Sequence, residues 1–186
     1  MNIMIVGVGG QGTLLASRIL GKVAIKEGYD VKVSEVHGMS QRGGSVVTYV
    51  KYGDKVYSPI IDRGEADLIL AFEMLEAMRA LPYLKKGGKM IANTQKMNPM
   101  PVITGAMEYP ENIEEKLSAK INLQAVDALS LAEKAGTIKA VNVVLIGLLA
   151  KSMDVDKNVW IDVIKETVPK KFLDVNIKAF ELGYEL

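Results

Sequence analysis

Apolar residues give way abruptly to glycines near the start of the chain. The apolar run at residues 3–6 predicts a buried β-strand, and Gly7, Gly9 and Gly12 follow it at the spacing G-x-G-x-x-G. From Thr13 onward, apolar residues recur every three or four positions, which is typical of a helix that packs one face on a sheet. The start of the chain therefore predicts a strand, a tight turn and a helix.

The rest of the chain continues this alternation of strand-like and helix-like segments. We expect further strands at residues 30–36, 45–50, 55–57, 66–71, 89–92 and 121–126. The segments 45–50 and 55–57 are expected to form a β-hairpin around a turn. We expect helices from residue 13 to about 28 and at residues 72–79, 111–117, 129–135, 141–153, 159–168 and 172–182.

These elements predict an α/β fold. The expected architecture is a single domain over residues 1–186, with a doubly wound, mostly parallel Rossmann-like sheet, a β-hairpin insertion and a helical C-terminus. A right-handed β-α-β unit would open it within the first 36 residues.

The glycine-rich turn after the first strand is the first candidate binding site. Glycines permit a sharp turn and let backbone approach a phosphate, and the following helix offers unpaired N–H groups and the positive end of its dipole. The alternative is a strand-to-helix turn that binds nothing. The candidate cofactor-binding residues here are Gly7, Gly9, Gly10, Gln11 and Gly12.

A second glycine-rich loop, residues 37–44, follows the predicted strand at 30–36. Open α/β sheets bind ligands at the carboxyl ends of their strands, and Arg42 offers a planar fork to a phosphate or a carboxylate. The alternative is a solvated loop with an ordinary surface arginine. We expect both loops to lie side by side at one sheet edge and to form one anion-receptive surface. The candidates in this loop are Ser40, Gln41, Arg42, Gly43 and Gly44.

Other polar residues near strand ends are weaker candidates. Glu35 follows Gly12 at about the 20-residue distance where an acid holds the ribose of NAD. His37 is the only histidine, which excludes a histidine metal site, and a structural role is more common for such a residue than base catalysis. Glu73 and Glu76 share a helix face, where we expect a solvated, capping or partner-facing role. Asn93 follows the predicted strand at 89–92.

Composition narrows the class of protein. Lys and Arg number 23 against 22 Asp and Glu, so the formal charge of +1 offers no global field to nucleic acid or an anionic membrane. The absence of cysteine excludes a disulfide, a cysteine nucleophile and thiolate-bound zinc or iron–sulfur clusters in this chain. The apolar stretch at 140–150 is far short of the roughly 20 residues that span a bilayer. We expect a soluble, cytoplasmic protein.

Two missing motifs argue against nucleotide hydrolysis and against binding of thiamine diphosphate by this chain. The chain has no G-x-x-x-x-G-K-[ST] phosphate loop, which disfavours a nucleotide hydrolase of that type. Gly53-Asp54 is followed by Lys55 and lacks the glycine and asparagine pair of a thiamine-diphosphate and magnesium motif.

Several stretches together resemble one family. They are Gly7-Val-Gly-Gly-Gln-Gly12, Glu35-Val-His-Gly-Met-Ser-Gln-Arg-Gly-Gly-Ser-Val46, Tyr57-Ser-Pro59, and residues 66–73 with Glu76, Ala77 and Arg79, followed by Asn142. This pattern covers nearly the whole chain. It resembles the small subunit of the indolepyruvate:ferredoxin oxidoreductases and, more broadly, the gamma subunit or domain of the 2-oxoacid:ferredoxin oxidoreductases.

The resemblance implies a division of labour between two subunits. The family reaction converts a 2-oxo acid and coenzyme A to an acyl-CoA, carbon dioxide and reduced ferredoxin. A large partner subunit would hold thiamine diphosphate, Mg and the iron–sulfur clusters, and ferredoxin would be reduced there. This chain would have no catalytic residue and no turnover alone. In a hetero-oligomer it would help to bind coenzyme A, and the substrate would be indolepyruvate or another arylpyruvate.

Two other functions stay open at this point. Gly7, Gly9, Gly12 and Glu35 alone would support a free-standing NAD(P)-dependent oxidoreductase or a nucleotide-binding module. A non-catalytic scaffold is the third class, although it has no evident need for two glycine-rich loops at strand ends.

Overall fold

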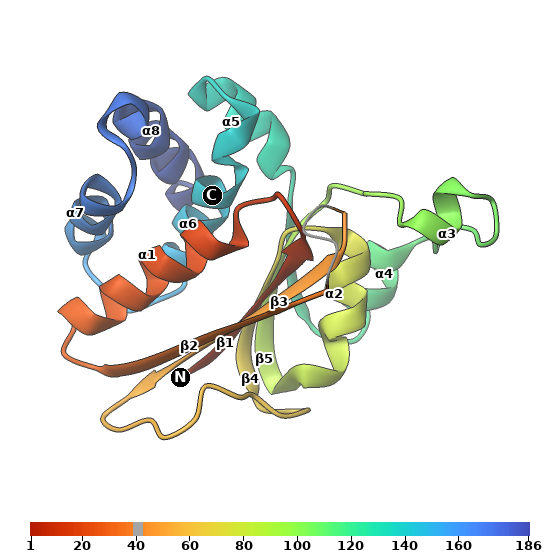
Figure 1. The fold of residues 1–186 in the computed structure, drawn as a ribbon, viewed down its shortest axis with the longest axis horizontal. Coiled ribbons are helices and arrows are strands. Elements are labelled where there is room, and N and C mark those ends of the chain that lie inside the picture. The colour runs from red at the N-terminus through yellow and green to blue at the C-terminus, as the bar shows by residue number, and fades with distance from the viewer. Residues whose placement is uncertain (39–42) are drawn as a thin grey trace.

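The computed structural model describes residues 1–38 and 43–186, and within them the chain forms one six-stranded sheet flanked by helices (Figure 1). The strands are β1 (Asn2–Val8), β2 (Asp30–His37), β3 (Ser45–Gly53), β4 (Ala66–Ala71), β5 (Leu84–Asn93) and β6 (Asn122–Val126). Their order across the sheet is β2-β3-β1-β4-β5-β6.

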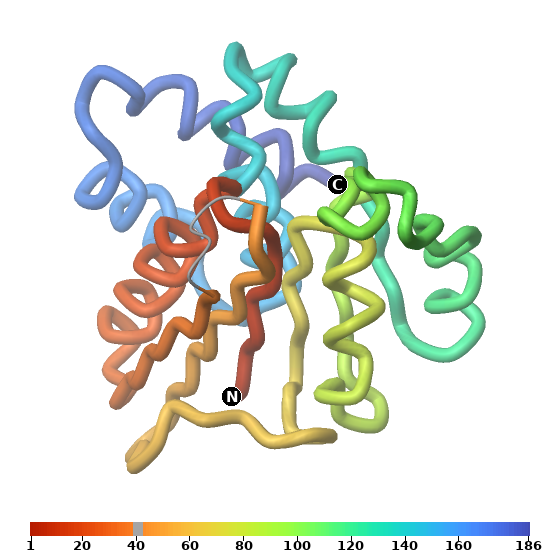
Figure 2. Tube along the Cα trace, turned by 45° about the vertical axis from the view of Figure 1, so that its right-hand side comes forward, coloured from red at the N-terminus to blue at the C-terminus, as the bar shows by residue number. Residues whose placement is uncertain are grey.

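Most of the sheet is parallel. β1, β4, β5 and β6 are parallel neighbours, whereas β3 pairs antiparallel with both β1 and β2. β2 therefore runs in the same direction as β1, but β3 lies between them. The loops that follow β1, β2, β4 and β5 consequently leave the sheet at one edge, opposite the N-terminus (Figure 2).

The structure contains a β-hairpin, as expected, but the predicted pairing of residues 45–50 with 55–57 is wrong. β3 continues to Gly53 and forms the hairpin with β2, so that Val33 lies opposite Val50, and residues 55–57 form no strand. The backbone N–H of Val56 instead donates to the Asp30 carboxylate at 2.9 Å. β3 is a central strand with a neighbour on each side, and an alternating pattern alone cannot reveal which segments provide them. The expected β-α-β opening is present as β1, α1 and β2, and β3 lies between its two strands.

Helices cover both faces of the sheet, as expected for a doubly wound fold. The described part of the chain forms α1 (Thr13–Lys26), α2 (Met74–Ala80), α3 (Met100–Ile103), α4 (Ile113–Ser118), α5 (Ala128–Ala135), α6 (Val141–Lys151), α7 (Lys157–Thr167) and α8 (Leu173–Tyr184). One apolar core unites α1 and the C-terminal helices with one face of the sheet, and a second core joins α2 and α4 to the other face (Figure 1).

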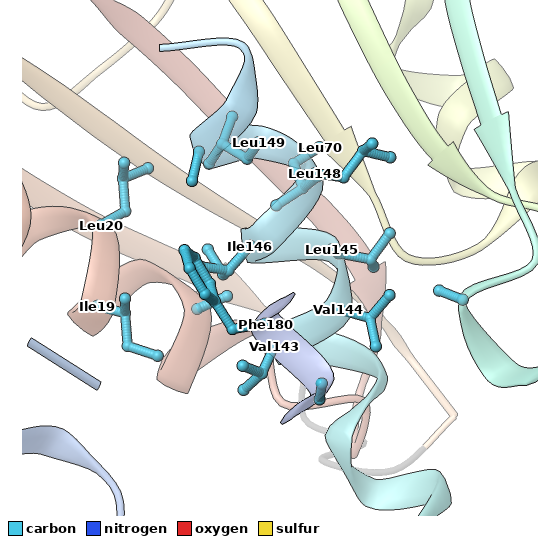
Figure 3. Close-up of a cluster of buried hydrophobic side chains, with 14 of the residues drawn as sticks. Ile19, Leu20, Leu70, Val143, Val144, Leu145, Ile146, Leu148, Leu149 and Phe180 are labelled. Carbon is cyan, nitrogen blue, oxygen red and sulfur yellow. The ribbon is translucent and has the colours of Figure 1, made fainter. Parts of the chain in front are cut away.

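Helix α6 explains why the C-terminal helices stay together. Every residue of α6 except Lys151 is buried, because the helix lies between the sheet and α8 and also contacts α1. Figure 3 shows its side chains pointing toward Leu70 of the sheet, Ile19 and Leu20 of α1, and Phe180 of α8. This packing fixes the first residue of α6 close to the glycine turn.

The predicted element types agree with the structure outside the hairpin, with boundaries that differ by a few residues. β5 begins at Leu84 rather than near residue 89, and the one-turn helix α3 lies where no helix was expected. In the described residues, no helix combines the length and the apolar character needed to cross a membrane.

Candidate functional site

The glycine turn joins the last residue of β1 to the first residue of α1. Gly12 precedes α1 with a φ of 85°, and a Cβ added there would lie 2.5 Å from the Asn142 Nδ2 atom of α6. That amide donates to the Gly12 carbonyl oxygen at 3.3 Å. Gly12 is therefore required both by its backbone conformation and by the close approach of α6.

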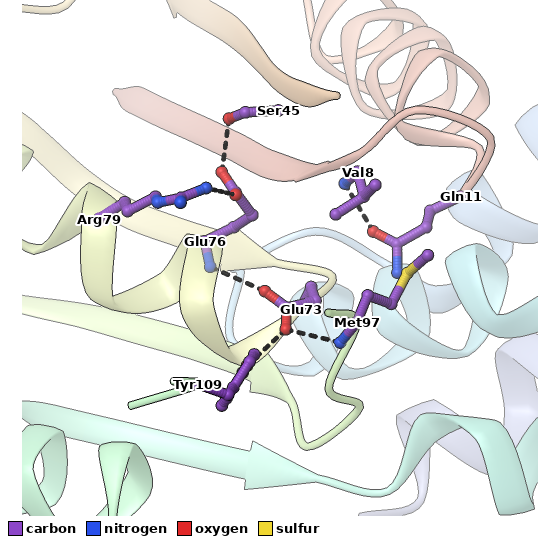
Figure 4. Close-up of polar contacts among 8 residues, drawn as sticks. All are labelled: Val8, Gln11, Ser45, Glu73, Glu76, Arg79, Met97 and Tyr109. Atoms are coloured by element: carbon purple, nitrogen blue, oxygen red, sulfur yellow. Dashed lines mark hydrogen bonds and ion pairs between the residues drawn. The ribbon is translucent and has the colours of Figure 1, made fainter. Parts of the chain in front are cut away.

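Gln11, a predicted binding residue, is used to build the turn. Its Oε1 atom accepts from the Val8 N–H at 2.7 Å (Figure 4). Its Nε2 atom donates to the Phe72 carbonyl oxygen at 3.1 Å. The same Nε2 atom lies 3.4 Å from the Gln95 Oε1 atom. The side-chain amide thus ties the end of β1 to the ends of β4 and β5.

The two glycine-rich loops lie directly side by side. The Gly9 N–H donates to the Gly44 carbonyl oxygen at 2.9 Å, and the Gly43 N–H donates back to the Gly9 carbonyl oxygen at 3.4 Å. The expected adjacency of the loops is therefore confirmed at these residues. The remaining candidates of the second loop, Ser40, Gln41 and Arg42, lie outside the described residues.

One cavity, here called the Glu35 cavity, lies between the glycine turn and the end of β2. It has a volume of about 390 Å³ and is lined by Gly9, Gly10, Gly12, Thr13, Leu14, Glu35, His37 and Val46. The Glu35 carboxylate accepts from the Thr48 hydroxyl at 3.3 Å, and the His37 Nδ1 atom lies 2.9 Å from the Gly38 carbonyl oxygen. The lining of this cavity thus combines glycines of the turn with one acid and one histidine.

A second cavity, here called the Lys139 cavity, lies on the other side of the same turn. It has a volume of about 470 Å³ and is lined by Gly9, Gly10, Gln11, Gly12, Gln95, Met97, Leu129, Ile138, Lys139 and Val141. Sequence reasoning missed Gln95, Met97 and Lys139. No local motif marks them, because the segment after β5 and the 3₁₀ turn Ile138–Ala140 meet the glycine turn only in the folded chain.

Glu73 is buried, which corrects the expectation of a solvated acid but confirms its capping role. It is 1% exposed and caps α2 by accepting from the Glu76 N–H at 2.9 Å. Its other carboxylate oxygen accepts from the Met97 N–H at 3.0 Å and from the Tyr109 hydroxyl at 2.6 Å (Figure 4). Burial, and then the hydrogen bond to Glu73, raise the pKa of the Tyr109 phenol.

Glu76 is buried as well and connects α2 to the start of β3. It is 4% exposed, and its carboxylate accepts from the Ser45 hydroxyl at 2.5 Å and from the Arg79 guanidinium at 2.6 Å (Figure 4). Ser45 directly follows Gly44, so Glu76 helps to hold the end of the second loop. Burial of an acid at this level requires such partners.

Asn93, the remaining weak candidate, holds the ends of three elements together. Its Nδ2 atom donates to the Phe72 carbonyl oxygen at 3.2 Å, and its Oδ1 atom accepts from the Ala128 N–H at 3.2 Å. Both polar atoms of the buried amide are therefore occupied within the protein.

The fold and the site together define a class of protein: a Rossmann-like α/β chain with a glycine turn, flanked by two cavities, at the carboxyl edge of its sheet. The chain belongs to the pyruvate ferredoxin/flavodoxin oxidoreductase family, whose model matches residues 2–186. It is 47% identical to the indolepyruvate oxidoreductase subunit IorB of Pyrococcus horikoshii, over 98% of this chain and 93% of that protein. The family resemblance seen in the sequence is confirmed.

Two solved structures share the fold. The gamma subunit of keto/oxoacid ferredoxin oxidoreductase from Geobacter sulfurreducens matches with a TM-score of 0.73 and 24% identity, covering 99% of this chain and 96% of that one. The 2-oxoglutarate:ferredoxin oxidoreductase of Magnetococcus marinus, solved with 2-oxoglutarate, coenzyme A and succinyl-CoA bound, matches with a TM-score of 0.71 and 16% identity. The match covers all of this chain and 30% of that longer chain.

Proposed function

We propose that this chain is the non-redox subunit of a 2-oxoacid:ferredoxin oxidoreductase that acts on indolepyruvate or a related arylpyruvate. Its family membership and its identity of 46–47% to subunits named for indolepyruvate support this substrate class. The complete enzyme would oxidatively decarboxylate the 2-oxo acid, transfer the acyl group to coenzyme A and reduce ferredoxin.

The residues of this chain do not fit the redox cofactors of such an enzyme. The chain has no cysteine to bind an iron–sulfur cluster. In residues 1–38 and 43–186, no group of three His, Asp or Glu side chains comes together to hold a metal ion. We therefore assign thiamine diphosphate, Mg and the clusters to a larger partner subunit, through which ferredoxin is reduced, and expect a hetero-oligomer.

The role that we assign to this chain is binding of coenzyme A. The observation that carries the assignment is the pair of backbone hydrogen bonds between Gly9 and Gly43–Gly44, because it joins both glycine-rich loops into one surface. Helix α1 points its N-terminus at this surface and favours an anionic group there. Arg42, in the second loop, would add a full positive charge for a phosphate of coenzyme A.

The test is the change Arg42→Ala in the chain co-expressed with its large subunit. Loss of a charge-assisted hydrogen bond costs about 1.5–3 kcal/mol, so the KM for coenzyme A should rise on the order of tenfold to a hundredfold. Arg63→Ala is the matched control, because Arg63 is exposed and lies outside both loops. Unchanged kinetic constants for coenzyme A in Arg42→Ala would remove Arg42 from the site.

One observation favours a second function, NAD(P) binding. Glu35 lines a cavity together with Gly9, Gly10 and Gly12, as an acid that binds ribose hydroxyls would. Titration of the purified chain with NADH and NADPH separates the two functions. Saturable micromolar binding together with hydride transfer would favour the nicotinamide enzyme, whereas coenzyme A dependence of the assembled complex favours our proposal.

A further inference from the structure

Three large apolar side chains gather on one short excursion of the chain, residues 98–108, here called the 98–108 loop. Met100, Ile103 and Met107 are 66%, 64% and 64% exposed. Met100 and Ile103 are three residues apart in α3 and therefore lie on one helical face, and Figure 1 shows α3 projecting at the right-hand end of the molecule. Single exposed apolar residues are normal on a protein surface, but a cluster of them marks an interaction site.

The base of the loop is closed by one buried carboxylate. The Glu73 Oε1 atom accepts from the Met97 N–H at 3.0 Å and from the Tyr109 hydroxyl at 2.6 Å, so the residues on either side of the loop meet there (Figure 4). The Lys96 ammonium group adds a cation–π contact, 6.0 Å from the centroid of the Tyr109 ring. Compact loops whose ends are held together in this way frequently carry function.

The loop is also ordered by its own backbone. The Thr104 N–H donates to the Met100 carbonyl oxygen at 2.9 Å. The Met107 N–H donates to the Pro101 carbonyl oxygen at 3.0 Å, and Pro101 lies at the start of α3, where its fixed φ favours the helix. A surface that is ordered before its partner arrives lowers the entropic cost of binding.

The loop adjoins the surface that we assign to coenzyme A. It leaves the sheet after β5, at the edge where the glycine turn leaves β1. Pro99 of the loop and Gly43 of the second glycine-rich loop line one small cavity of about 50 Å³. In the proposed function, coenzyme A bound by this chain takes up an acyl group formed on the large subunit. The large subunit must therefore face this edge of the sheet, where the loop stands.

We propose that the 98–108 loop docks in an apolar groove of the large subunit that binds thiamine diphosphate. Met100, Ile103 and Met107 enter the groove, and flexible methionine side chains adapt to its shape. Glu108 is the only charged residue of the loop, which therefore has no basic side chain to hold an anionic membrane. The identity of the partner rests on the proposed function.

The first test compares methionine oxidation in the chain alone and in its co-expressed complex with the large subunit. Dilute hydrogen peroxide oxidises exposed methionines, and mass spectrometry gives the rate at each residue. Met100 and Met107 should react on the order of tenfold more slowly in the complex, because a covered side chain is shielded from the oxidant. Met1, which is 43% exposed at the opposite edge of the sheet (Figure 2), is the internal control and should react equally in both samples. Equal rates for Met100 and Met107 in the two samples would overturn the proposal.

The second test is the change Ile103→Gln, which replaces an apolar side chain of the loop by a polar one. The dissociation constant of the complex, measured by mass photometry on serial dilution, should rise on the order of tenfold, as for a central interface residue. Ile25→Gln is the matched control, because Ile25 is 61% exposed and lies in the last turn of α1. Both variants should keep the free energy of unfolding of the parent chain. An unchanged dissociation constant in Ile103→Gln, or an equal rise in Ile25→Gln, would overturn the proposal.

Two other occupants of the loop would be recognised in the chain alone. A dimer in light scattering that Ile103→Gln separates would mean that the loop binds a second copy of this chain. Flotation with phosphatidylglycerol vesicles that Ile103→Gln abolishes would mean that it binds a membrane. Either result would contradict the proposal.

The outcome is separable from the coenzyme A assignment. Ile103→Gln should raise the dissociation constant of the complex and leave the KM of the fully assembled enzyme for coenzyme A unchanged, whereas Arg42→Ala should do the reverse. Absence of the Ile103→Gln effect beside an intact Arg42→Ala effect would remove this inference and leave the proposed function standing. Failure of the parent chain to form a complex with the large subunit would remove the proposed function, and this inference with it.

Discussion

The Glu35 cavity and the Lys139 cavity share the same glycine backbone and differ in everything else that lines them. The Glu35 cavity takes its side chains from α1, β2 and β3, close in the sequence to the turn. Apart from Gln11 of the turn itself, the Lys139 cavity takes them from the segment after β5 and from the start of the C-terminal helices, about 85 to 130 residues away. The same backbone turn therefore borders two cavities, and elements distant in the sequence decide the charge and polarity of the second one.

The cavities also differ in how their walls are supported. In the Lys139 cavity, the buried Glu73 carboxylate holds the backbone of Met97, and the side-chain amides of Gln11 and Gln95 hold each other. Among residues 1–38 and 43–186, Glu35 has one side-chain hydrogen bond, of 3.3 Å, from Thr48. Variants that act on the shared turn should disturb both cavities, and variants that act on one wall should disturb only one.

The largest effect is expected from Gly12→Ala, which breaks the element common to both cavities. An alanine at this position would have to keep the positive φ of Gly12, which costs about 1–2 kcal/mol. Its Cβ atom would also overlap Asn142 of α6, which adds about 1–3 kcal/mol. Urea unfolding should show a loss of roughly 2–5 kcal/mol in the free energy of unfolding, and the KM of the assembled enzyme for coenzyme A should rise.

Gly10→Ala is the control for this variant. Gly10 has a φ of 101°, but a Cβ there would meet nothing within 4 Å. It should show the conformational cost alone. If both variants lost the same stability, the approach of Asn142 would not be what requires Gly12.

The next largest effect is expected from Glu73→Gln, which acts on the Lys139 cavity only. Three donors converge on the Glu73 carboxylate, and a glutamine would turn its NH2 group toward at least one of them. The free energy of unfolding should fall by about 2 kcal/mol. The KM of the assembled enzyme for coenzyme A should stay unchanged, because none of these groups lines the Glu35 cavity.

Glu108→Gln provides the matched control, because Glu108 is an exposed acid of the same segment. It should leave both stability and this KM unchanged. A raised KM for coenzyme A in Glu73→Gln would mean that Glu73 supports the whole sheet edge rather than one wall.

A smaller effect is expected from Tyr109→Phe, which removes one donor to Glu73. Loss of this hydrogen bond should cost about 1–2 kcal/mol at neutral pH. The pKa of the Tyr109 phenol is raised in the folded protein, first by burial and then by Glu73. The unfolded chain therefore releases this proton first, and stability must fall as the pH rises above the ordinary tyrosine pKa of about 10.

This alkaline loss of stability gives the measurement. Unfolding free energies at several pH values above neutrality should fall less steeply with pH in Tyr109→Phe than in the parent chain. Identical slopes would show that Tyr109 is not held protonated by its place beside Glu73.

The sequence predicts the part of this site around the glycine turn better than the part that distant segments contribute. The strand, glycine turn and helix around Gly12 are local features, and the adjacency of Gly9 and Gly44 follows from strand direction. The hairpin partner of β3 and the burial of Glu73 depend on contacts that no local pattern records. Lys139 is the clearest case. This exposed lysine follows α5 in the sequence and comes to lie beside the glycine turn only because α6 packs against that turn.

The smallest effect, and the most direct comparison of the two cavities, is expected from Glu35→Gln. If the glycine turn holds a phosphate of coenzyme A, the Glu35 carboxylate repels it across a solvated cavity, and such exposed charge interactions are worth about 0.2–1 kcal/mol. Glu35→Gln should therefore lower the KM of the assembled enzyme for coenzyme A by roughly 1.5- to fivefold. Glu27→Gln, an exposed acid just beyond α1, is the control. A raised KM would instead mean that Glu35 accepts a hydrogen bond from a ligand hydroxyl, so that the Glu35 cavity recognises a ribose and the two cavities differ in ligand chemistry rather than in charge alone.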